Sequence, residues 1–149
     1  MGWLRLPIAF LLSVALMAAL GVIVQTQFVI SALKAAGAPT GLGDRIAMTG
    51  ADLIGLGPLY GALIAIGFLI AFLAAALLLR AVTLPRAVVF AVAGAVCIAV
   101  MLVLMREVFF GVPVIAGART LAGQAAQAAC GALAGAVFAM LTGSKPRQL

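Results

Sequence analysis

Histidine is absent from this 149-residue chain, and acidic side chains are scarce. Charged residues make up 8% of the sequence, only three of them are Asp or Glu, and there are two cysteines. The lack of histidine excludes haem ligation by histidine, most zinc sites and the commonest general base. Two cysteines are too few for a disulfide framework or for the ligands of an iron–sulfur cluster. We therefore expect no metal and no cofactor.

Apolar residues dominate what is present. They account for 67% of the sequence, and the mean hydropathy is +1.38. Soluble domains are about half apolar and about a quarter charged, so this composition excludes a water-soluble globule. It also excludes an intrinsically disordered chain. The length leaves room for one domain, and we predict a single membrane domain over residues 1–149.

Four long apolar stretches carry no charged residue in their interior. A helix that crosses a bilayer needs about 20 apolar residues, and it satisfies its own backbone hydrogen bonds in lipid. The alternation that a barrel wall requires is absent. We predict an all-α integral membrane protein, a four-transmembrane-helix bundle, with spans at residues 6–30, 56–79, 87–105 and 120–141. The first stretch could instead be a cleaved signal peptide, but its length and the missing cleavage pattern favour a retained helix.

Two connections, residues 31–55 and 106–119, are not ordinary loop sequence, and the second is too apolar to lie in water. In the first, Thr49 and Asp52 have the spacing of a capping box, which predicts a short helix from about Thr49. The second contains the apolar run Val108–Ile115. We expect both to lie on the bundle, and the sequence leaves open whether they are interfacial or re-entrant.

Basic residues decide the predicted orientation. One side of the bundle carries Arg5, the turn from Arg80 to Arg86 and the tail 142–149, with five basic residues and no acid. The other side carries four basic residues and all three acids. Because Lys and Arg favour the cytoplasmic side, we call this second side the outer side. We predict a multi-pass protein of a bacterial inner (plasma) membrane with both termini cytoplasmic.

Small residues recur every four positions in three of the spans. In lipid, such faces let helix backbones approach closely. We predict a helix-packing surface formed by Gly57, Gly61, Ala91, Ala95, Gly123, Gln127, Gly131 and Gly135. The alternative is a pore or ligand groove lined by Gln124 and Gln127. Cys97 and Cys130 fall near the middle of their spans, where a thiolate is costly, and we interpret them as packing residues.

Six of the seven charged residues on the predicted outer side form a candidate cluster: Asp44, Arg45, Asp52, Arg106, Glu107 and Arg119. Such an outer charge cluster could bind a substrate or transfer protons, or it could be a structural network of ion pairs. Carboxylates deep in a membrane mark ion pathways, whereas these lie at the edge. We favour the structural interpretation, in which Arg106 and Glu107 hold the 31–55 segment in place.

Catalytic motifs are missing. The sequence has no nucleophile elbow, P-loop or dinucleotide fingerprint, and no basic patch for nucleic acid. We expect neither an enzyme nor a nucleic-acid partner. Our leading hypothesis is a non-catalytic small membrane subunit or assembly partner of a larger inner-membrane complex. It would act through helix packing, and its partners would be the lipid bilayer and other membrane subunits or a second copy. The alternatives are a small oligomeric transporter or channel and, less favoured, an enzyme acting on lipid.

Overall fold

The computed structural model describes residues 4–108 and 116–143, and within those ranges the chain forms helices, turns and no strand. The helices are α1 (Arg5–Ala35), α2 (Leu42–Gly55), α3 (Gly57–Leu78), α4 (Arg86–Val108) and α5 (Leu121–Thr142), with a 3-10 turn at Ala116–Arg119. All except α2 are long and apolar enough to cross a membrane. The prediction of an all-α chain with four such helices is confirmed, and they suggest a multi-pass membrane protein. Residues 109–115 of the second predicted outer segment, and 144–149 of the predicted tail, lie outside the described residues.

The ends of the helices follow from local chemistry. α1 continues to Ala35, beyond the predicted end at residue 30, because nothing in the intervening sequence breaks a helix. The turn that follows contains Gly37, whose φ of +87° favours glycine, and the Ala38 N–H donates back to the Leu33 carbonyl. α5 begins where the Thr120 hydroxyl accepts a hydrogen bond from the Gly123 N–H at 3.1 Å.

The helix in the 31–55 segment begins earlier than we predicted. α2 starts at Leu42, and Thr49 lies in its middle, so the predicted start near Thr49 is wrong. The Asp44 carboxylate accepts a hydrogen bond from the Gly41 N–H at 2.8 Å and so satisfies a backbone donor at the helix start. The Thr49 hydroxyl instead donates to the Arg45 carbonyl one turn before it.

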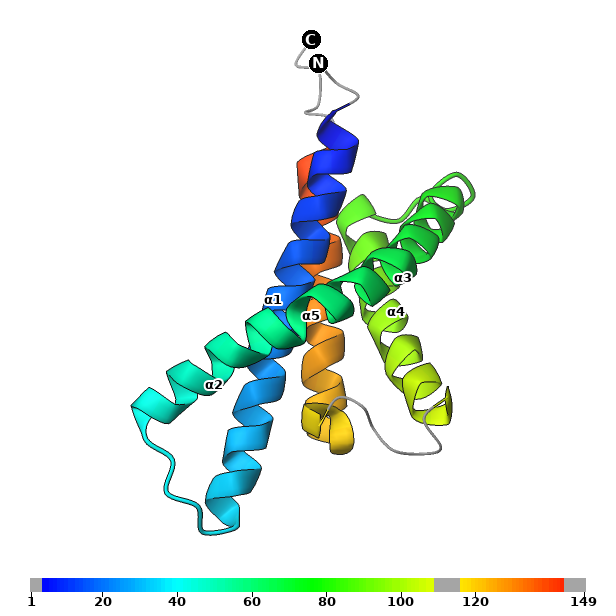
Figure 1. Cartoon of the computed structure of the whole chain (residues 1–149). Coiled ribbons are helices and arrows are strands. Elements are labelled where there is room, and N and C mark those ends of the chain that lie inside the picture. Colours follow the sequence, from blue (N-terminus) through cyan, green and yellow to red (C-terminus); the bar gives the residue numbers. More distant parts are fainter. Residues whose placement is uncertain (1–3, 109–115, 144–149) are drawn as a thin grey trace.

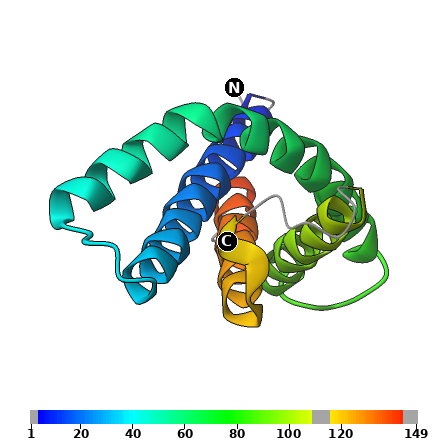
Figure 2. The same ribbon diagram turned by 60° about the horizontal axis from the view of Figure 1, so that its bottom comes forward.

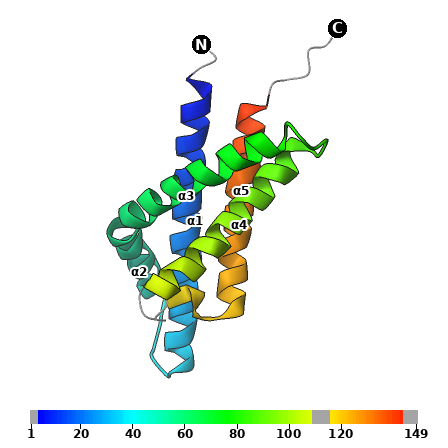
Figure 3. The same cartoon turned by 90° about the vertical axis from the view of Figure 1, so that its right-hand side faces the viewer.

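The first and last helices, α1 and α5, define two ends of the molecule. α1 begins and α5 ends at the same end of the molecule, which we call the proximal end, and the Arg5 guanidinium donates to the Leu141 and Gly143 carbonyls there (Figure 1). α1 ends and α5 begins at the opposite, distal end. Figure 3 shows α3 and α4 crossing α1 and α5 obliquely. Figure 2, which looks toward the distal end, shows α2 and α4 on opposite sides of α1 and α5.

Five phenylalanines from four helices form the core near the proximal end. Phe72 of α3 is central: its ring stacks on Phe68 and Phe138 at 4.7 and 4.5 Å between centroids, and meets Phe10 and Phe90 edge-on. Large aromatic side chains in such arrangements add ~0.5–1.5 kcal/mol per pair beyond their burial. This cluster joins α1, α3, α4 and α5 at one level.

Candidate functional site

The α4–α5 contact is a seam of glycines. A Cβ added to Gly131 would lie 2.5 Å from the Gly94 carbonyl oxygen, closer than real Cβ atoms approach. A Cβ on Gly94 would collide with the Gly131 carbonyl, and one on Gly135 with the carbonyl of Phe90. The two backbones therefore touch along this line, as small residues allow in membrane helices. Gly131 and Gly135 belong to the predicted packing surface, while Gly94 and Phe90 do not.

The other predicted packing residues differ in how closely they are packed, and the two glycines of α3 have the most room. Ala91 and Ala95 are half-buried beside the seam, and the fully buried face of α4 carries Phe90, Gly94 and Ile98 instead. Gly123 is buried in the first turn of α5. A Cβ on Gly61 would meet Ala18 at an ordinary 3.7 Å, and one on Gly57 would meet nothing within 4 Å.

A buried polar contact ties α1, α3 and α5 together. The Tyr60 hydroxyl donates to Gln127 Oε1 at 3.2 Å, and Gln127 Nε2 donates to the Gly21 carbonyl at 2.8 Å. Gln127 is 1% exposed. A Cβ on Gly21 would lie 2.7 Å from the Tyr60 ring, so glycine is what admits the other two side chains. Gln127 therefore contacts neighbouring helices on both sides of its amide, as a packing residue does.

Gln124 has a structural contact of its own. Its Nε2 donates to the Ala118 carbonyl at 3.1 Å, within the turn that precedes α5. The two glutamines proposed for a pore lining thus bind protein carbonyls in this structure.

The polar face of α2 lies against α1. The fully buried Thr26 hydroxyl lies 2.7 Å from Asp52 Oδ2 and donates to it, and Arg45 Nη1 donates to Gln27 Oε1 at 3.0 Å. A hydrogen bond with one ionised partner is roughly twice as strong as one between neutral groups. Asp52 and Arg45 therefore anchor α2 on α1 through neutral side chains.

The remaining charges of the predicted outer cluster lie elsewhere. Arg106 and Glu107 are exposed at the distal end of α4, on the far side of α1 and α5 from α2. Arg119 is exposed in the turn before α5, and Asp44 is at the start of α2. The structure therefore divides the six residues among separate places and does not bring Arg106 and Glu107 to the 31–55 segment.

The opposite face of α2 is apolar and points outward. Leu42, Ile46 and Ile54 are 81%, 74% and 82% exposed. Small residues recur every four positions on the same face, and all are exposed: Gly43, Ala47, Ala51 and Gly55. A Cβ at either of these glycines would meet nothing within 4 Å. α2 thus carries the small-residue spacing of a membrane packing helix on a face that no described residue covers.

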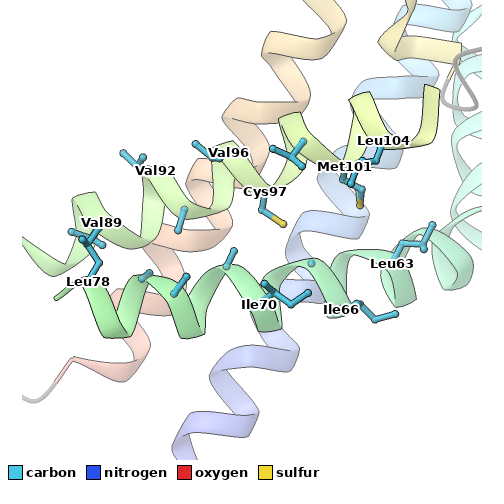
Figure 4. Close-up of a pocket in the computed structure, with 16 residues that line it drawn as sticks. Leu63, Ile66, Ile70, Leu78, Val89, Val92, Val96, Cys97, Met101 and Leu104 are labelled. Carbon is cyan, nitrogen blue, oxygen red and sulfur yellow. The ribbon is translucent and has the colours of Figure 1, made fainter. Parts of the chain in front are cut away.

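A groove of about 730 Å³ lies between α3 and α4. Its walls are apolar along their whole length, from Leu78 and Val89 near the proximal end to Leu63 and Leu104 at the other end of the groove. Figure 4 shows the helices closest at Leu78 and Val89 and spreading apart toward the other end. Ile70 and other wall residues are more than half exposed, so the groove opens to the surroundings.

Neither Cys97 nor Cys130 forms a disulfide. Cys97 lines the groove and is half-buried, whereas Cys130 is buried in α5. Within residues 4–108 and 116–143, no group of three or more Cys, Asp or Glu side chains could hold a metal ion.

Comparison with protein-family models, curated proteins and solved structures finds no match to this chain.

Proposed function

We propose that this protein is a small non-catalytic subunit or assembly partner of a larger complex in a bacterial inner membrane. Both termini would be cytoplasmic, and the protein would act by packing its helices against those of other subunits. Four apolar helices support the membrane location. The observation that carries the proposal is the outward face of α2, with its small-residue spacing and exposed Leu42, Ile46 and Ile54.

The anchoring of α2 supports a packing role for that face. An amphipathic helix at a membrane surface normally turns its polar side to water. α2 does the reverse: Asp52 and Arg45 bind α1, and the apolar side faces away from the protein. Such a side suits hydrocarbon or an apolar neighbouring helix, and its small residues favour the helix because they admit a close backbone.

The transporter alternative gains less support. A transport path needs polar side chains that are available to a solute, and charged ones inside a membrane usually mark it. The buried Gln127 and Thr26 instead contact Gly21 and Asp52 of the protein itself.

Gentle detergent extraction followed by native mass measurement tests the proposal. We expect the protein to leave its native membrane with unrelated subunits at a fixed stoichiometry. Ala47→Trp should abolish that association, because a large side chain blocks close approach to α2. Ala62→Trp is the matched control, since Ala62 is exposed on α3 outside both the α2 face and the groove.

Two results would contradict the proposal. A homo-oligomer without other subunits would favour the transporter alternative. A monomer, or a complex that tolerates Ala47→Trp as well as Ala62→Trp, would remove the role of α2.

A further inference from the structure

We propose that the groove between α3 and α4 is a binding site for an anionic phospholipid. In this arrangement an acyl chain lies between the two helices, and the phosphate lies at the proximal end beside Arg80 and Arg86. This site is independent of the α2 face.

The lining of the groove fits hydrocarbon. Its wall residues are Leu, Ile, Val, Ala, Met, Cys and Gly, and several face outward, so in a membrane the neighbouring medium is lipid. From Leu63 to Leu78 the α3 wall is about 22 Å long at 1.5 Å per residue. One leaflet of hydrocarbon is about 15 Å deep, so the groove can hold a lipid chain along its full depth.

The charges at the two ends of the groove differ. At the proximal end, Arg80 follows the lining residue Leu78 by two positions, and Arg86 precedes Val89 by three, with no acid in the turn between. At the distal end, Arg106 is followed at once by Glu107, and their charges cancel. The electrostatic attraction for a phosphate is therefore at the proximal end.

Arg80 is the better placed of the two arginines for a headgroup. Arg86 already donates to the Thr142 hydroxyl at 2.6 Å and lies over the Phe90 ring at 5.0 Å. Arg80 is exposed in the turn that follows α3. A basic residue at a membrane surface adds ~1 kcal/mol of attraction to an anionic lipid, which is about a fivefold change in affinity.

The test uses the full chain in bilayer discs of equal parts phosphatidylcholine and phosphatidylglycerol. After detergent extraction, native mass measurement counts the lipids that stay bound. We expect phosphatidylglycerol to be retained in preference to phosphatidylcholine. Arg80→Gln should lower that preference about fivefold, and the control Arg106→Gln, at the other end of the groove, should leave it unchanged.

A second pair of variants tests the groove itself. Ala74→Phe adds a ring to the lining and should reduce the retention of both lipids, whereas Ala76→Phe, exposed on the same helix outside the lining, should not. Circular dichroism checks that each variant is folded, and the Arg80→Gln result decides the question if Ala74→Phe is not. Equal retention of the two lipids, or equal effects of Arg80→Gln and Arg106→Gln, would overturn the proposal. So would a lipid-free dimer that Ala74→Phe converts to monomers.

Discussion

Replacing Gly131 by alanine measures how tightly α4 and α5 are packed. The new Cβ would lie 2.5 Å from the Gly94 carbonyl oxygen, and ordinary contact begins at 3.4 Å, so the helices must part locally by about 0.9 Å. Overpacking of this kind costs ~1–3 kcal/mol. Alanine regains ~0.5–1 kcal/mol over glycine within a helix. We expect a net loss of about 1 kcal/mol in the free energy of unfolding, measured by titration with dodecyl sulfate and circular dichroism.

The matched control is Gly61→Ala in α3. Its Cβ would lie 3.7 Å from the Ala18 Cβ, an ordinary contact, so the helical preference of alanine acts alone. This variant should be as stable as the wild type or more stable by up to ~1 kcal/mol. The reasoning is refuted if Gly131→Ala is at least as stable as Gly61→Ala, because the two glycines would then be equally free of their neighbours.

Three further predictions concern the polar contacts and the topology. Gln127→Leu should lower the free energy of unfolding by about 1–2 kcal/mol in the same titration, because it leaves the buried Tyr60 hydroxyl without its partner; unchanged stability would contradict the contact. Asp52→Leu should speed proteolysis in the loop before α2, because it removes the bond to α1, while Glu107→Gln on α4 should not; equal cleavage in the two variants would refute this anchoring. Cysteines placed at Gly41 and Thr83, in a chain without its native cysteines, should react with a membrane-impermeant thiol reagent from opposite sides of the membrane. Reaction of both from the same side would contradict the four-span topology.

The length and the hydropathy of the four apolar stretches were enough to predict the four long helices. An apolar run of about 20 residues has one stable form in lipid, because the backbone must satisfy its own hydrogen bonds. The ends of a helix could also be predicted where a proline indicates them, as Pro85 does before α4 and Pro58 does in the first turn of α3. The extension of α1 to Ala35 could not be predicted, because Ser31–Ala35 contains no residue that indicates where the helix ends.

The faces of those helices were much harder to predict. α4 is apolar all round, so no polar side distinguishes the stripe of Ala91 and Ala95 from the stripe of Phe90, Gly94 and Ile98. The second stripe is the buried one. One signal was present in the sequence: Gly94 is the only glycine of α4, and a lone glycine in a helix often marks a close backbone approach.

The charge cluster shows a different limit. Sequence places residues at one side of a membrane but does not fix how far apart they lie across it. Arg106 and Asp52 both belong to the predicted outer side, yet α4 and α2 lie on opposite sides of α1 and α5. The hydrogen-bond partners of these charged side chains are shown only by the structure, in which Asp52 accepts a hydrogen bond from the Thr26 hydroxyl and Arg45 donates one to Gln27.

The buried polar groups and the outward apolar faces have a common origin. Because the surroundings of a membrane helix are as apolar as its core, burying more apolar surface gives little drive for association. The inner side of α2 is held by the polar contacts of Asp52 and Arg45 beside the half-buried Leu53, and the side that carries Leu42 and Ile46 faces outward. The same reasoning applies to α3 and α4, which are joined through the contact of Phe72 with Phe90 and leave the apolar groove open on their outward side. Both outward surfaces arise where the internal contacts end, and these are the places where an external helix or a lipid can bind without displacing any contact within the protein.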